Sequence, residues 1–142
     1  MSQSTPRAEI THYDALVYVM VMASAVDSAM SDTELERIGQ IARSLPVFDG
    51  FDDDLLTEIA RDCANILSGP EGMDIALEII RDALPKRLYD TAYALAVEIM
   101  SVDRVVSAEE IRLLQLIRDR LHLDKLTCAA IERGAIARYR PA

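Results

Sequence analysis

The chain has no tryptophan, few aromatic residues, and few of the residues that form turns. Aromatic residues make up 5% of the 142 residues, and there are only five glycines and five prolines. An all-β domain needs many turns, which depend on such residues, so this composition argues against one. Hydrophobic residues reach 51%, which suits a packed core in a single domain of this length. The composition therefore predicts one helical domain.

Cysteine and basic residues are also scarce. The two cysteines, Cys63 and Cys128, are too few for a disulfide framework. Lysine and arginine number 15 against 24 acidic residues, which gives a net charge of −9. Binding of phosphate groups needs clustered Lys and Arg, so nucleic acids and anionic membranes are disfavoured as partners. The charge favours a cation or a protein partner with a basic surface.

No hydrophobic run is long enough to cross a membrane. The longest, from Ala15 to Val26, is interrupted by Tyr18 and Ser24, whereas a spanning helix needs about 20 apolar residues. The first seven residues lack the charged region, apolar run and cleavage site of a signal peptide. We therefore expect a cytoplasmic protein.

A short phrase occurs twice, 76 residues apart. The first copy contains Val26-Asp27, Met30-Ser31 and Glu34, and the second contains Val102-Asp103, Val106-Ser107 and Glu109-Glu110. Each copy follows an apolar stretch and leads into an amphipathic one. Such internal repetition predicts two loosely duplicated halves.

Hydrophobic periodicity predicts a polar lead over residues 1–10 and an all-α bundle of about seven helices over residues 11–142. The helices predicted over 11–27 and 86–102 are apolar almost all round, so they should lie buried at the centre. Thr11 and Asp52 are candidate N-caps. The remaining helices are expected to begin after Ser31 (with Pro46 ending that helix), after Asp52, after Ser107 and after Asp124. One more helix is expected to have Pro70 in its first turn.

Each repeated phrase contains the capping box Ser-x-x-Glu, in which Ser and Glu bond each other's backbone N–H groups. Capping accounts for Ser31 with Glu34 and for Ser107 with Glu110. It does not account for Asp27 and Asp103, which recur at matching places outside the boxes.

Binding of a cation is the alternative explanation of the phrase. The seven-residue spacing from Asp27 to Glu34, and from Asp103 to Glu110, matches the second half of a calcium loop. The first half of that loop is missing, so an EF-hand is excluded. A weak calcium or magnesium site formed by Asp27, Glu34, Asp103 and Glu110 stays open beside the capping interpretation.

The two-fold pattern of apolar helix, Asp, hydrophobic residue, Ser-x-x-Glu and amphipathic helix resembles the TerB-like domain of tellurite-resistance proteins. The resemblance covers about residues 12–138. In that family the phrase is commonly Ala-Asp-Gly-x-Ile-Ser-x-x-Glu, whereas Ser28 and Arg104 stand here in place of the glycine. The resemblance implies an all-α bundle, acidic surface clusters and an accessory role in a metal or stress response. It does not imply an enzyme.

Other chemically capable residues have structural explanations. Asp49, Asp52, Asp53 and Asp54 should cap and charge the start of a helix, with a cation site as the minor alternative. Glu98 should lie at a helix rim or pair with an arginine. Cys63 and Cys128 lie on apolar faces and should act as small hydrophobes. No catalytic residue is identified.

The sequence thus predicts a non-catalytic module that binds a protein partner or a divalent cation through acidic clusters. A small metal-dependent enzyme, or a subunit whose activity needs a second chain, is the alternative. Whether the chain forms a homodimer is left open.

Overall fold

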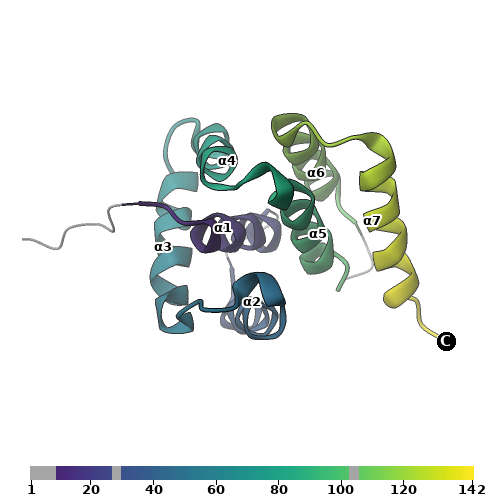
Figure 1. The fold of residues 1–142 in the computed structure, drawn as a ribbon, viewed down its shortest axis with the longest axis horizontal. Helices are drawn as coiled ribbons and strands as arrows, with labels where there is room; N and C mark the ends of the chain where they lie inside the picture. Colours follow the sequence, from purple (N-terminus) through teal and green to yellow (C-terminus); the bar gives the residue numbers. More distant parts are fainter. Residues whose placement is uncertain (1–8, 27–29, 103–105) are drawn as a thin grey trace, which may run out of the picture.

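A computed structural model describes residues 9–26, 30–102 and 106–142. Within these ranges the chain forms seven α-helices and no strand, which confirms the prediction of an all-α bundle (Figure 1). No helix in the described ranges is long and apolar enough to span a bilayer. The helices are α1 (His12–Ala25), α2 (Asp32–Ser44), α3 (Leu56–Leu67), α4 (Gly72–Ala83), α5 (Tyr89–Met100), α6 (Ala108–Leu121) and α7 (Lys125–Arg138).

The core is built around α1 and α5, as their apolar sequences predict. Every residue of α1 from Asp14 to Ala23 is buried, and seven of the twelve residues of α5 are buried. In Figure 1, α1 lies at the centre of the molecule, in contact with α2, α3, α4 and α5. Burial of so many aliphatic side chains, at about 25 cal/mol per Å² of apolar surface, is the main force holding the bundle together.

Three helices begin two or three residues later than predicted, because local turns precede them. Asp52 caps a 3-10 turn, Asp53–Leu55, and α3 begins only at Leu56. Pro70 lies before α4 rather than in its first turn, since Glu71 adopts a left-handed conformation with φ of 56° and the helix begins at Gly72. A further 3-10 turn, Lys86–Leu88, precedes α5.

The duplication seen in the sequence extends to the helices. A shift of 76 residues carries α1 onto α5 and α2 onto α6, to within a residue at each end. The packing is repeated as well, because α1 contacts α2 and α3, and α5 contacts α6 and α7. A further helix, α4, follows α3 and packs against α1, α3 and α6.

Both predicted capping boxes are present. The N–H of Ser31 donates to Oε1 of Glu34 at 2.8 Å, and the N–H of Glu34 donates to Oγ of Ser31 at 3.2 Å. The box at Ser107 and Glu110 has distances of 2.9 and 3.1 Å. Thr11 caps α1 as predicted, and Asp14 completes a third box there. Each box satisfies backbone donors that the helix itself leaves unpaired.

Replacing Ser31 or Ser107 with alanine is expected to lower the free energy of unfolding by about 0.5–2 kcal/mol each, because a helix N-terminus loses its cap. We expect the larger loss at Ser107, since its partner Glu110 is buried. Urea unfolding measures both. Ser44→Ala is the matched control, because Ser44 is exposed at the end of α2 and its hydroxyl only bonds carbonyls within its own helix. Equal stability of all three variants would reject the capping role.

Candidate functional site

The four residues predicted to bind a metal divide between described and undescribed parts of the chain. Asp27 and Asp103 lie outside the described residues. Glu34 and Glu110 begin α2 and α6, and each uses Oε1 to bond the N–H of its capping serine. A cation would therefore meet these carboxylates mainly through Oε2. The metal site itself stays a prediction.

The two glutamates differ in their exposure to solvent. Glu34 is half-buried, whereas Glu110 is 5% exposed. A buried carboxylate needs hydrogen bonds or opposite charges in place of water, and the N–H of Ser107 provides one such bond to Glu110. The first turns of α2 and α6 are thus related in sequence, but their glutamates differ in access to solvent.

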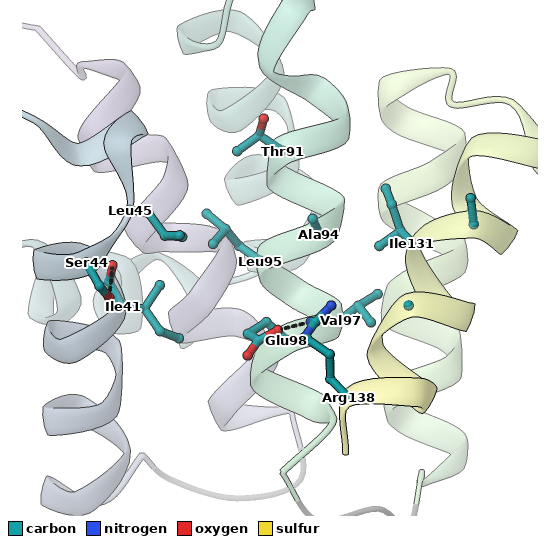
Figure 2. Close-up of a pocket in the computed structure, with 12 residues that line it drawn as sticks. Ile41, Ser44, Leu45, Thr91, Ala94, Leu95, Val97, Glu98, Ile131 and Arg138 are labelled. Atoms are coloured by element: carbon teal, nitrogen blue, oxygen red, sulfur yellow. Dashed lines mark hydrogen bonds and ion pairs between the residues drawn. The ribbon is translucent and has the colours of Figure 1, made fainter. Parts of the chain in front are cut away.

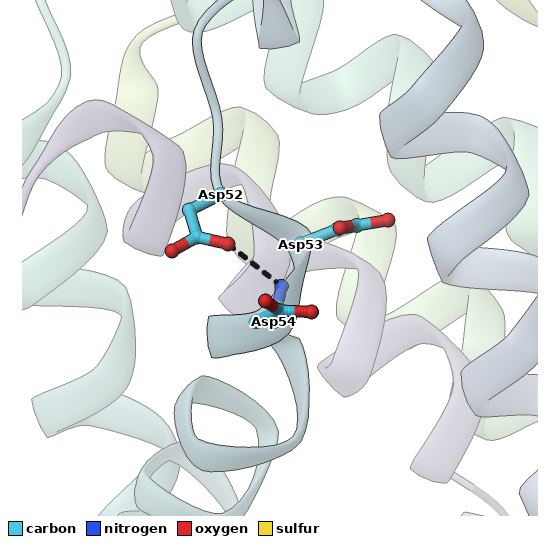
Figure 3. A group of neighbouring side chains, drawn as sticks. All are labelled: Asp52, Asp53 and Asp54. Carbon is cyan, nitrogen blue, oxygen red and sulfur yellow. Dashed lines mark hydrogen bonds between the residues drawn. The ribbon is translucent and has the colours of Figure 1, made fainter.

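Of the acidic residues predicted to cap α3, only Asp52 is a cap, and it caps the 3-10 turn before that helix (Figure 3). Asp52 accepts a hydrogen bond from the N–H of Asp54 at 3.0 Å, and Asp53 pairs with Arg43 at 3.2 Å. One carboxylate oxygen from each of Asp52, Asp53 and Asp54 lies within 4.8 Å of the others, and all three residues are exposed. Exposed acidic groups of this kind are common at helix starts, where they meet the positive end of the helix dipole.

Both cysteines are buried and free, as their apolar surroundings predict. Burial raises the pKa of the Cys63 thiol to about 12, and burial also raises the pKa of the Cys128 thiol. A nucleophilic or metal-binding cysteine must be a thiolate near neutral pH. Neither residue meets that requirement, so both act as hydrophobes.

Glu98 pairs with an arginine, as expected. Oε1 of Glu98 forms an ion pair with Arg138, and Oε2 accepts a hydrogen bond from the Tyr139 hydroxyl. Arg37 of α2 donates to the Tyr139 oxygen at 3.1 Å. The carboxylate on α5 is therefore neutralised by the end of α7.

A second polar cluster links α5, α6 and α7, and sequence reasoning missed it. The Tyr93 hydroxyl donates to Oε2 of Glu132, and Nη1 of Arg118 lies 3.2 Å from the Tyr93 oxygen and 3.3 Å from that same Oε2. Burial, followed by the hydrogen bond to Glu132, raises the pKa of Tyr93 above its usual value. Arg118 of α6 and Glu132 of α7 form an ion pair that joins the two helices, and the Tyr93 phenol stays protonated. These contacts give the cluster a structural role.

Glu98 also lines an apolar groove of about 570 Å³ between α2, α5 and α7 (Figure 2). We call it the α2/α5/α7 groove. The Glu98–Arg138 ion pair closes one end, and the rest of the lining is mainly aliphatic. Its lining residues are Ile41, Ser44, Leu45, Thr91, Ala94, Leu95, Val97, Glu98, Ala130, Ile131, Gly134 and Arg138. Such a surface suits contact with apolar side chains more than polar chemistry.

Comparison of the chain with family models, with curated proteins and with solved structures gives no match.

Proposed function

We propose that the chain is a non-catalytic, TerB-like helical module that works in the cytoplasm in a metal-stress response such as tellurite resistance. It acts by binding a divalent cation, or a protein partner with a basic surface, through the acidic residues of its two repeats. These are Asp27 with Glu34 and Asp103 with Glu110. The observation that supports this most is the repeated unit of a buried helix followed by a capped helix with acidic residues in its first turn. The unit occurs at α1–α2 and at α5–α6 with matching bounds.

The state of the reactive side chains favours binding over catalysis. Cys63 and Cys128 are held as thiols, and the acid–base pairs Glu98–Arg138 and Glu132–Arg118 neutralise each other. Protonated thiols are poor nucleophiles. The net charge of −9 supports attraction of cations and basic surfaces.

Calorimetry and thermal melts of chelator-treated protein with calcium or magnesium test the cation arm. Affinity for such carboxylate-poor sites is weak, with Kd on the order of 10⁻⁴–10⁻³ M. A ligand at about 10 mM that binds only the folded state should then add about 1.4–2.7 kcal/mol to the free energy of unfolding. The double variant Asp27→Asn with Asp103→Asn should stay folded and lose this gain.

The matched control is Asp82→Asn with Asp119→Asn, which removes the same charge from two exposed residues elsewhere. It should keep the full response to the cation. An equal loss in both double variants would show only general attraction of cations to an acidic protein. If the wild-type melting temperature ignores millimolar cations, the cation arm fails, and binding of a basic partner is the arm to test.

A further inference from the structure

Three exposed aliphatic side chains surround a pocket of about 320 Å³ between α5, α6 and α7, which we call the α5/α6/α7 pocket. They are Val106, Ile111 and Ile136, and they are three of the eight large hydrophobic residues that the described part of the chain exposes. The rest of the lining is Val97, Met100, Ser101, Leu114, Arg118 and Glu132, of which the last two are paired with each other. Exposed hydrophobic residues that gather around a hollow indicate a contact site.

Unpaired basic residues lie beside this pocket. Arg133 precedes Ile136 by three residues on α7, so the two side chains lie on the same side of the helix. Arg140 follows shortly after the helix ends. Both arginines are exposed and form no ion pair with the described residues. Two free guanidinium groups at the edge of an apolar pocket favour a partner that presents carboxylates around an apolar side chain.

The chain itself carries a surface of that kind, because its charge is divided unevenly. Residues 1–84 contain 16 acidic and five basic residues, a net charge of −11, whereas residues 85–142 contain eight acidic and ten basic residues, a net charge of +2. The pocket lies in the second half. A second copy of the chain therefore offers it an acidic surface on α1 to α4.

On helix α4 an exposed aliphatic side chain stands among carboxylates. Ile75 is 48% exposed. Glu71 lies four residues before it and Asp82 seven residues after it, so all three share one side of the helix. Glu71 and Asp82 are exposed and form no ion pair with the described residues, whereas Asp74 and Glu78 are paired within the molecule. This face of α4 matches the pocket both in its apolar centre and in its charge.

The two surfaces lie on different sides of one molecule. In Figure 1, α4 is at the upper left of the bundle and the end of α7 is at the lower right. Ile75 therefore cannot reach the pocket of its own chain. A symmetric contact through the pocket would place Arg133 beside the Arg133 of the other copy, where like charges repel. The complementary arrangement is head to tail.

We propose that the chain associates with a second copy of itself head to tail, with Ile75 of one copy inserted into the α5/α6/α7 pocket of the next. Glu71 and Asp82 then face Arg133 and Arg140. The contact is small and the net charge of −9 on each copy opposes it, so we expect a Kd on the order of 10⁻⁴–10⁻³ M. A head-to-tail contact that does not close into a ring continues beyond the dimer. This interface goes beyond the proposed function and uses none of its acidic residues.

Sedimentation equilibrium of the full chain from about 0.05 to 2 mM tests the association. Salt at about 0.15 M reduces the Debye length to about 8 Å and so screens repulsion between distant charges. The weight-average mass should rise with concentration, to at least about 1.5 times the monomer mass at about 2 mM. Arg133→Gln with Arg140→Gln should raise the Kd at least about threefold, because the carboxylates lose their partners.

Ile75→Asp removes the inserted side chain, and Ile111→Asp places a charge in the pocket. Both residues are exposed, so both variants should fold, and each alone should stay monomeric. An equal mixture of the two should form dimers and nothing larger, because one variant keeps the pocket and the other keeps Ile75. Leu126→Asp is the matched control: Leu126 is 81% exposed on α7, does not line the pocket, and receives the same charge. This variant should associate as the wild type does. Circular dichroism verifies that all three are folded.

Three results would overturn the proposal. They are a wild-type mass that stays at the monomer value up to about 2 mM, an equal loss of association in Leu126→Asp and Ile75→Asp, and no dimer in the mixture of Ile75→Asp and Ile111→Asp. The last result would show a symmetric interface or another surface. Ile75→Asp should leave any response to calcium unchanged, and Asp27→Asn with Asp103→Asn should still associate. Failure here is therefore separable from failure of the proposed function.

Discussion

Replacing Gly72 with alanine is expected to lower the free energy of unfolding by about 3 kcal/mol and the melting temperature by about 10 °C. A Cβ at this position would lie 2.3 Å from the carbonyl oxygen of Ile66 and 2.7 Å from both Cα and the carbonyl oxygen of Leu67. These are backbone atoms at the end of α3, so no side chain can rotate out of the way. The start of α4 would have to move, and the buried Leu77 and Ile80 would move with it.

Gly69→Ala is the control for Gly72→Ala. Its Cβ would meet the same carbonyl oxygen of Ile66, but at an ordinary contact distance of 3.5 Å. We expect a change within about 0.5 kcal/mol there. Urea unfolding measures both variants. Similar stabilities for the two would show that α4 can shift at no cost, and the close approach of α3 and α4 would then not be a constraint.

Gly72 also shows why the sequence predicts some features of this protein and not others. Helix propensity alone favours alanine over glycine inside a helix by about 1 kcal/mol, so the sequence suggests that the substitution stabilises. The clash comes from α3, whose position depends on tertiary packing. By contrast, the capping boxes at Ser31 and Ser107 involve residues only three positions apart, and the sequence predicted both.

The candidate sites likewise divide into features that neighbouring residues determine and features that depend on tertiary packing. The pairing of Glu98 with an arginine was predictable in kind, because a carboxylate on a largely buried helix needs a partner. That the partner is Arg138, 40 residues away, was not, and neither was the cluster of Tyr93, Arg118 and Glu132. The α2/α5/α7 groove needs three helices to be placed before it exists. The repeat reveals the duplication, but only the packing shows that α4 rests on α1, α3 and α6.

Replacing Leu16 with alanine is expected to lower the free energy of unfolding by about 2–5 kcal/mol, because it opens a cavity in the most enclosed helix of the bundle. Leu16 lies on α1 and is 0% exposed. Surrounding helices on every side of α1 limit how far the site can collapse, and the cost of a cavity rises with the volume that remains. Ile75→Ala, on the exposed face of α4 where the side chain is 48% exposed, should change stability by no more than about 0.5 kcal/mol.

Leu95→Ala gives the sharper comparison, because it tests whether the two halves differ as their packing indicates. Leu95 on α5 is 3% exposed, nearly as buried as Leu16, but it lines the α2/α5/α7 groove. Space left by the missing side chain would open onto the groove and fill with water, so we expect a loss towards the lower end, about 2 kcal/mol. Urea unfolding of both variants at low protein concentration measures the difference. A loss at Leu95 equal to that at Leu16 would mean that the groove is as enclosed as the core.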